Sequence, residues 1–302
     1  MCIAYIALGV NTDWPLIIAA NRDEFHARPA LAARPWPNEP AILAGLDVRA
    51  GGTWLGLERE HGRLALLTNY REPLAAPEPG RRSRGELIPQ FLRERRPPAA
   101  FLQELHAQDQ HYAGFNLFVL QWPTASSPML AGYYSNRHPQ GHPMQLDAGT
   151  RVLSNEWLDS PWPKSQYLKN TLDASRFDGS DQAVEALFDA LRHDRPAPDA
   201  QLPRTGLSLE RERLLSSPFI ISPEYGTRCS TVIVVDKHGR GLLRERSFAP
   251  DATLTRQHDW YFQWPATPTE ANWSGASSIV TTGIAPKPDP VRKPSSIRKE
   301  TL

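Results

Sequence analysis

The chain has few of the residues that a disulfide framework or a membrane span requires. Its 302 residues include only two cysteines, Cys2 and Cys229, so a disulfide scaffold is excluded and a reducing compartment is expected. No apolar run approaches the roughly 20 residues that span a bilayer. The apolar start lacks the charged region of a signal peptide, and polar residues interrupt it at 11–13. These absences predict a cytoplasmic protein without a membrane span.

Charge and motif content exclude two further classes of protein. The 34 basic and 33 acidic side chains give a formal net charge of +1 at pH 7, far from the basic excess of a nucleic-acid binder. The nine histidines are scattered, and neither His-Glu-x-x-His nor Cys-x-x-Cys occurs. A phosphate-cradling glycine motif is also missing. We therefore expect no nucleic-acid partner, no metal and no cofactor.

What the sequence does contain favours strands over long helices. Proline contributes 29 residues, about twice its usual share of roughly 5%. Apolar runs at Cys2–Leu8, 16–20, 53–57 and 64–68 predict strands in the first 70 residues. The clearest helical period lies at 181–193. Strands and helices come in blocks that do not alternate as βαβ units, which predicts an α+β fold.

Two features punctuate this organisation. Ser83 and Glu86 have the spacing of a capping box, which predicts a helix that begins there. Residues 266–302 are rich in Pro, Ser, Thr and Lys and offer little to bury, so a disordered tail is predicted after a single domain over residues 1–265.

Cys2 is the candidate nucleophile. Its side chain is small enough that removal of Met1 is expected, which leaves a thiol and a free α-amino group on one residue. Their reference pKa values, about 8.5 and about 7.7–8.0, match for proton transfer near neutral pH. This is the N-terminal-nucleophile arrangement, in which nucleophile and base share a residue. The alternative reading is a small apolar residue that opens a buried strand.

Asn21-Arg22-Asp23-Glu24 follows the second predicted strand. Four polar residues after an apolar run normally mark a strand that ends in solvent. If the first two strands pair antiparallel, however, Asp23 lies beside Cys2 and would bind its α-ammonium group by a charge-assisted hydrogen bond.

Three more residues stand next to predicted strands. Asn69 and Asn155 each follow an apolar run and are either turn residues or donors of N–H groups to an oxyanion. Arg228 precedes a late strand and is either a surface charge or an anchor beside a carbonyl or acidic group.

Several short blocks, in order from Met1 to about Asp236, together resemble the NRDE family, also called the transport and Golgi organisation protein 2 family. The family takes its name from the tetrapeptide at 21–24. The other blocks are Gly51-Gly52-Thr53-Trp54-Leu55-Gly56, Thr68-Asn69-Tyr70-Arg71, Ser83-Arg84-Gly85-Glu86-Leu87, Gly114-Phe115-Asn116-Leu117, Leu153-Ser154-Asn155, Pro161-Trp162-Pro163-Lys164 and Tyr225-Gly226-Thr227-Arg228.

The resemblance implies the four-layer αββα fold of N-terminal-nucleophile hydrolases, nearest to the bile-salt hydrolase and penicillin V acylase branch. That branch uses an N-terminal Cys, an Asp, two oxyanion-site Asn residues and a late Arg. These roles fall on Cys2, Asp23, Asn69, Asn155 and Arg228.

One position departs from the acylase branch, whose motif is Arg-Asn-x-Asp. Ala20 stands where that arginine belongs, and the arginine appears instead as Arg22. Positions 20 and 22 share a face of a strand, so Arg22 is expected on the same side. Asn21, Arg22 and Trp54 are the candidate binding residues of the site.

Two functions follow from these residues. The first is a hydrolase that acts on a linear non-peptide amide, with Cys2 as nucleophile. The second is a non-catalytic binding or trafficking protein for haem, acyl-CoA or another lipid, in which Cys2, His26 or Trp54 forms a ligand or wall. A scaffold whose tail binds partners is a third reading. The sequence determines neither the ligand nor the oligomeric state.

Overall fold

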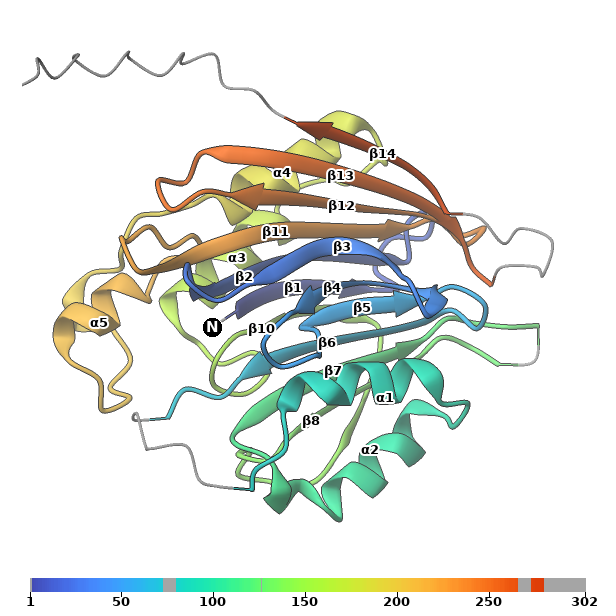
Figure 1. Ribbon diagram of the computed structural model, residues 1–302, viewed down its shortest axis with the longest axis horizontal. Coiled ribbons are helices and arrows are strands. Elements are labelled where there is room, and N and C mark those ends of the chain that lie inside the picture. The colour runs from blue at the N-terminus through green and yellow to red at the C-terminus, as the bar shows by residue number, and fades with distance from the viewer. Residues whose placement is uncertain (1, 73–79, 126, 266–272, 280–302) are drawn as a thin grey trace, which may run out of the picture.

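The computed structural model describes residues 2–72, 80–125, 127–265 and 273–279. It contains two seven-stranded antiparallel sheets and a small number of helices (Figure 1). The α+β class predicted from the sequence is therefore confirmed. Among the described residues, none of the helices is long and apolar enough to cross a bilayer.

Sheet A joins the first two strands of the chain to its last four. Its strand order is β10-β1-β2-β11-β12-β13-β14, so β1 lies between β10 and β2. The strands are β1 (Cys2–Leu8), β2 (Leu16–Phe25), β10 (Gly149–Leu153), β11 (Tyr225–Val235), β12 (Arg240–Phe248), β13 (Leu254–Gln263) and β14 (Ser274–Ile279).

Sheet B is built from consecutive strands in chain order, so each strand pairs with its neighbour in the sequence. Its seven strands are β3 (Ala30–Trp36), β4 (Glu39–Asp47), β5 (Leu55–Glu58), β6 (Arg63–Asn69), β7 (Phe115–Gln121), β8 (Leu130–Ser135) and β9 (Met144–Leu146).

Alternation along the strands divides the apolar side chains into three clusters. One lies between the sheets and includes Ala4 and Ile6 of β1 with Leu57 of β5. A second joins sheet A to α3 (Pro163–Asp173) and α4 (Asp181–Leu191). A third joins sheet B to α1 (Leu87–Arg93), which packs on β5 and β6, and to α2 (Pro98–His106), which packs on β7 and β8 (Figure 1). A short helix, α5 (Leu209–Leu214), precedes β11.

The polar tetrapeptide at 21–24 lies inside β2 and not after it, so the predicted strand end at Ala20 is wrong. The reason is the central position of β2 between β1 and β11, whose backbones pair with residues 21–24. Asn21, Arg22 and Asp23 are buried. The sequence gives no direct sign of this, because the run has neither apolar residues nor alternation.

The predicted capping box is also wrong. Among the described residues, the Ser83 side chain caps no helix nitrogen, and a turn of 3₁₀-helix over Arg84–Glu86 precedes α1. Glu86 instead accepts a hydrogen bond from the Tyr112 hydroxyl at 2.8 Å and pairs with Arg82 at 2.6 Å.

Strand β14 lies within the segment for which a disordered tail is predicted, so the prediction is wrong for Ser274–Ile279. Its ladder with β13 uses backbone groups, which composition does not report. Just before it, Trp273 packs against the cluster between the sheets and donates its indole N–H to the Pro40 carbonyl. The rest of the predicted tail lies outside the described residues.

Candidate active site

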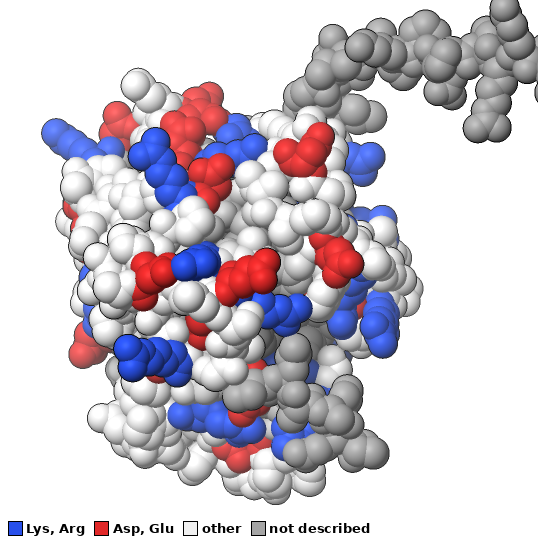
Figure 2. Space-filling view, turned by 90° about the vertical axis from the view of Figure 1, so that its left-hand side faces the viewer, with Lys and Arg blue, Asp and Glu red and all other residues white. Residues whose placement is uncertain are grey.

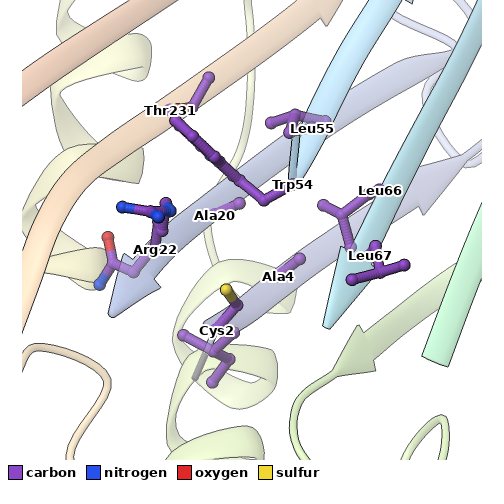
Figure 3. Close-up of a pocket in the computed structure, with 11 residues that line it drawn as sticks. Cys2, Ala4, Ala20, Arg22, Trp54, Leu55, Leu66, Leu67 and Thr231 are labelled. Atoms are coloured by element: carbon purple, nitrogen blue, oxygen red, sulfur yellow. The ribbon is translucent and has the colours of Figure 1, made fainter. Parts of the chain in front are cut away.

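Cys2 opens β1 directly opposite Arg22 of β2. Opposed residues of an antiparallel pair project to the same face, and here that face points between the sheets, as for Ala4. Figure 3 shows the sulfur of Cys2, the guanidinium group of Arg22 and the ring of Trp54 around one small cavity. With a volume of about 10 Å³, this cavity is too small for a substrate.

A larger cleft of about 740 Å³ opens beside Cys2. It draws its walls from both sheets and from the connections next to them. Sheet A contributes the polar end of β2, and sheet B contributes the end of β6 around Asn69. The segment at 83–85 and helix α5 complete it. Cys2 is half-buried at this cleft, which makes the cleft the candidate substrate site.

Two opposing effects act on the thiol of Cys2. Burial raises its pKa above the usual value, because the thiolate loses hydration. The positive charge of Arg22 and the backbone N–H of Asp23 favour the thiolate and lower the pKa. The net direction is upward, so the thiol is mostly protonated at neutral pH and needs a base before it attacks.

Arg22 is held by a stacked ring and a carboxylate. Its guanidinium carbon lies 4.2 Å from the centre of the Trp54 ring, and Nη2 donates to Asp47 Oδ2 at 3.2 Å. The absence of a side chain at Gly45 leaves room for this ring, since a Cβ there would lie 2.3 Å from Trp54. Arg28 donates to the same Asp47 oxygen at 2.6 Å.

Asp23 projects to the opposite face of β2 from Arg22, because successive side chains alternate. It is buried, and Thr227 Oγ1 donates to its Oδ1 at 2.7 Å. The register Cys2–Arg22 sets the backbone nitrogen of Cys2 toward the Asp23 end of the pair. Asp23 therefore lies nearer to the position of the α-amino group than to the thiol. Burial raises the pKa of Asp23, and Lys164 and the Thr227 hydrogen bond oppose the rise.

The two candidate oxyanion residues lie together but differ in access. Asn69 is half-buried and lines the cleft, whereas Asn155 is fully buried behind it. Asn155 Nδ2 donates to the carbonyl and to Oδ1 of Asn69, at 3.1 and 3.3 Å. A backbone hydrogen bond of 2.6 Å from Arg71 N to Asn155 O ties the ends of β6 and β10 together.

Lys164 is a site residue to which the sequence analysis gives no role. It is buried at the start of α3, and Nζ donates to Asn155 Oδ1 at 3.0 Å. Burial, with Arg71 nearby, lowers its pKa to about 7, and Asp23 and Cys2 oppose this. The sequence did contain one sign that Lys164 is buried. It lies on the same face of α3 as Leu168 and Leu172, which are four and eight residues further on and are buried.

Besides Asn155, two more predicted residues do not line the cleft. Arg228 stands at the bulge of β11 between Thr227 and Cys229, and its Nη1 donates to the carbonyls of residues 25, 26 and 28. Asn21 Nδ2 donates to Leu191 O and Pro218 O, both at 2.9 Å, and Ser230 donates to its Oδ1 at 2.6 Å. Arg228 thus holds a turn, and Asn21 holds the elements packed on sheet A.

The second cysteine differs from the first. Cys229 is buried beside Arg22 in the register of β2 and β11. Burial raises the pKa of its thiol well above the usual value, and Glu245 raises it further. It does not line the cleft as described.

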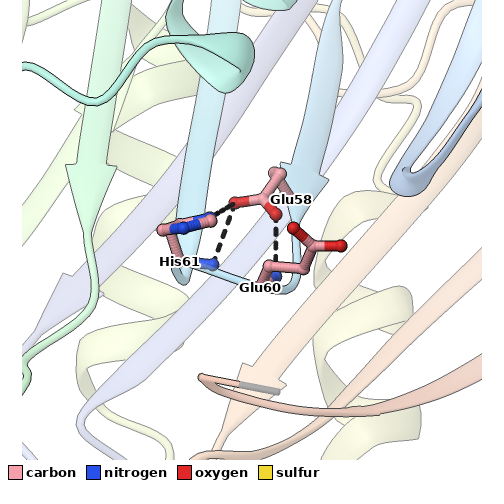
Figure 4. Close-up of side chains that lie close together, drawn as sticks. All are labelled: Glu58, Glu60 and His61. Atoms are coloured by element: carbon pink, nitrogen blue, oxygen red, sulfur yellow. Dashed lines mark hydrogen bonds and ion pairs between the residues drawn. The ribbon is translucent and has the colours of Figure 1, made fainter. Parts of the chain in front are cut away.

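One group of possible metal ligands occurs in the described part of the chain, formed by Glu58, Glu60 and His61 (Figure 4). It lies at the carboxyl-terminal end of β5, whereas Trp54 precedes the amino-terminal end of that strand. The Glu58 carboxylate accepts the backbone N–H groups of Glu60 and His61, at 2.7 and 3.0 Å, which accounts for the group as a turn. On the face in Figure 2, acidic and basic side chains are interspersed.

Comparison with known protein sequences gives three findings. The family model described as Transport and Golgi organisation 2 matches residues 1–250. A Transport and Golgi organization 2 homolog from Mus musculus is 35% identical over 279 residues, which cover 86% of this chain and 98% of that protein. The Bos taurus homolog is 36% identical over 284 residues, with 87% and 100% covered.

Among solved structures, a Caenorhabditis elegans N-acylethanolamine-hydrolyzing acid amidase ortholog covers 77% of this chain and 92% of its own. The identity is 12% and the TM-score 0.34, too low for an argument from that enzyme's fold.

Proposed function

The chain belongs to the Transport and Golgi organisation 2 family, and we propose that it is a cysteine N-terminal-nucleophile hydrolase of linear non-peptide amides. One observation carries the proposal. Cys2 opens an interior strand of sheet A at a cleft of about 740 Å³, with Arg22 opposite its side chain and Asp23 toward its backbone nitrogen. The thiol of Cys2 thus has a cation and a carboxylate beside it, and the α-amine of the same residue becomes available as a base once Met1 is removed.

The first step in this proposal is activation of the thiol. The α-amine of Cys2 accepts the thiol proton, directly or through one water, and the thiolate attacks the amide carbonyl. Asp23 orients the resulting α-ammonium group, and Arg22 stabilises the thiolate. A base on the same residue suits a thiol that burial keeps protonated.

The second step is collapse of the tetrahedral intermediate. Asn69 reaches the cleft and is the proposed N–H donor to the oxyanion. Asn155 and Lys164 position Asn69, because Lys164 holds the Asn155 oxygen and so turns its amide group toward Asn69. The C–N bond then breaks and the amine leaves with the proton from the α-ammonium group. Water adds to the thioester, releases the acid and restores the thiol.

The fold and setting are part of the same proposal. Helices pack against sheet A and sheet B on the faces away from the shared apolar cluster, which supports a four-layer αββα sandwich. Both cysteines are free, which supports action in the reducing cytoplasm. The proposed ligand is a small molecule, and no cofactor takes part.

Intact mass measured after incubation with a panel of acyl amides and activated esters tests the proposal. The expected result is an acyl adduct that maps to Cys2, absent from Cys2→Ala and present in Cys229→Ala. Protein that starts at Met1 should form no adduct, since its Cys2 has no free amine. A panel without any adduct on Cys2, in protein shown to start at Cys2, contradicts the hydrolase.

A carrier of haem, acyl-CoA or another lipid is the second candidate. The raised pKa of the Cys2 thiol favours it, because a protonated thiol suits a wall better than a nucleophile. The cleft also has apolar walls in Leu207, Leu214 and Phe25. Unmodified protein that binds haem or an acyl-CoA, with equal affinity in Asp23→Asn, supports the carrier.

A further inference from the structure

The cleft holds more positive than negative side chains. Among the described residues, seven arginines and four carboxylates line it. Several of these arginines are neutralised: Asp47 binds both Arg22 and Arg28, and Arg71 donates to Glu212 at 2.8 Å. Of the other arginines that line the cleft, Arg84 is the half-buried one.

Arg84 has a single side-chain hydrogen bond in the described part of the chain, from Nη1 to the Gly114 carbonyl at 2.8 Å. It forms no ion pair with any described residue. Among the nearby carboxylates, Glu72 interacts most strongly with Arg84, but the Glu72 carboxylate already pairs with Arg137 at 2.5 Å. Burial lowers the pKa of Arg84, and the Cys2 thiol is among the groups that interact with it. Among the described residues, this half-buried cation close to the nucleophile therefore has no carboxylate in ion-pair contact, although Glu72 and Glu24 interact with it at longer range.

The backbone around Arg84 is fixed by close packing. A Cβ on Gly52 would lie 2.4 Å from the carbonyl carbon of Gly85, so the two chain segments touch through their main chains. Thr53 N donates to Gly85 O at 3.1 Å in the same contact. Two blocks of the family resemblance, Gly51-Gly52-Thr53-Trp54 and Ser83-Arg84-Gly85-Glu86, meet here. The catalytic steps above do not use Arg84, although this contact presents it to the cleft.

We propose that Arg84 binds an anionic group, a carboxylate or a phosphate, on the amide that Cys2 attacks. The substrate class is then an anionic amide with an apolar chain, which Leu207 and Leu214 contact. A guanidinium group presents a fork of N–H donors that matches the oxygens of either anion. The amide part of this inference rests on the proposed hydrolase, whereas anion binding at Arg84 does not.

Binding to the inactive Cys2→Ala variant tests the anion site without any chemistry. The titrants are suberamate, octyl phosphate and the neutral octanamide, compared by calorimetry at 0.15 M salt. At least one anion should bind about tenfold or more tightly than octanamide, as expected for a charge-assisted hydrogen bond. The tighter anion identifies the group. In Cys2→Ala/Arg84→Gln this preference should fall toward one, and Arg84→Lys should keep part of it.

Arg211→Gln is the matched control, because Arg211 is an exposed arginine of the same cleft on α5. It should keep the parental preference, since solvent and salt screen its charge. Equal affinity of all three titrants, or an equal loss of preference in Arg211→Gln and Arg84→Gln, overturns the anion site.

Acylation rates separate this inference from the proposed function. With the parent protein, a mono-p-nitrophenyl suberate should acylate Cys2 faster than p-nitrophenyl octanoate. If Cys2 is acylated without this preference, the anion site at Arg84 is contradicted and the proposed hydrolase function stands. Anion binding that depends on Arg84, without any acylation of Cys2, keeps the anion site and overturns the hydrolase.

Discussion

The two faces of β2 at its polar end perform different tasks. Arg22 faces the space between the sheets and brings positive charge to the Cys2 thiol. Asn21 and Asp23 face α3, α4 and the segments around them, where Asn21 binds Leu191 and Pro218. Strand alternation thus divides four consecutive polar residues between the chemistry of the thiol and the support of the chain start. Asp23 has both tasks, because it binds Thr227 in the packed layer and is proposed to orient the α-ammonium group of Cys2.

The largest effect is expected at Asp23. Asp23→Asn keeps the shape and the Thr227 contact but removes the charge that orients the α-ammonium group. Acylation of Cys2 should fall at least ~100-fold, as for loss of a positioned acid–base element. The rate is measured by intact mass and normalised to the folded fraction, because Asp23 is fully buried. Asp13→Asn, in an exposed turn, is the control. A parental rate in Asp23→Asn would remove Asp23 from the site.

The next effect concerns stability. Asn21→Ala leaves two buried carbonyls and the Ser230 hydroxyl without their partner, so the free energy of unfolding should drop by about 2 kcal/mol. Urea unfolding measures this. The exposed Asn170→Ala on α3 should change it by less than about 0.5 kcal/mol. If Asn21→Ala were as stable as the parent but lost acylation, Asn21 would belong with the chemistry.

Arg22→Gln should act on the thiol through charge. A neighbouring cation lowers the pKa of Cys2, so its removal raises that pKa and leaves less thiolate at a given pH. Alkylation by iodoacetamide at pH 7 should slow several-fold, and the pH–rate curve should move to higher pH. Arg34→Gln, on the exposed side of β3, is the control. Superimposable curves for Arg22→Gln and the parent would show that Arg22 does not act on the thiol.

The smallest effect is expected at the other cysteine. Cys229→Ala removes a buried sulfur outside the cleft, which should cost about 1 kcal/mol of stability and leave acylation of Cys2 within about twofold. In the parent, timed iodoacetamide labelling with peptide mapping should modify Cys2 well before Cys229, because burial keeps the Cys229 thiol protonated. Equal labelling rates would contradict the assignment of Cys2.

The sequence predicts the elements whose apolar pattern is strong. Cys2–Leu8 and α4, predicted over 181–193, appear close to their predicted bounds, because burial and propensity agree there. It fails where backbone pairing decides: β3, β4 and β14 carry mixed side chains, and their partners are distant or follow no simple turn signal.

The site shows the same division. The antiparallel register that brings Arg22 and Asp23 to Cys2 follows from two adjacent strands and was predictable. The burial of Lys164 was not, because it depends on how α3 meets Asn155 and Arg71, which come from other elements. The bulge that turns Arg228 away from the cleft is likewise a feature of two paired strands and not of one segment.

The start of β1 at Cys2 has a practical consequence for handling the protein. Any peptide fused ahead of Cys2 converts its amine into an amide, and under the proposed mechanism such a fusion protein is a caged form. A protease that trims the fusion back to Cys2 would then act as a switch, with the moment of cleavage as time zero. Affinity tags for assays therefore belong at the carboxyl end of the chain. A cleavable leader ahead of Cys2 would provide silent and active forms of one polypeptide from one preparation.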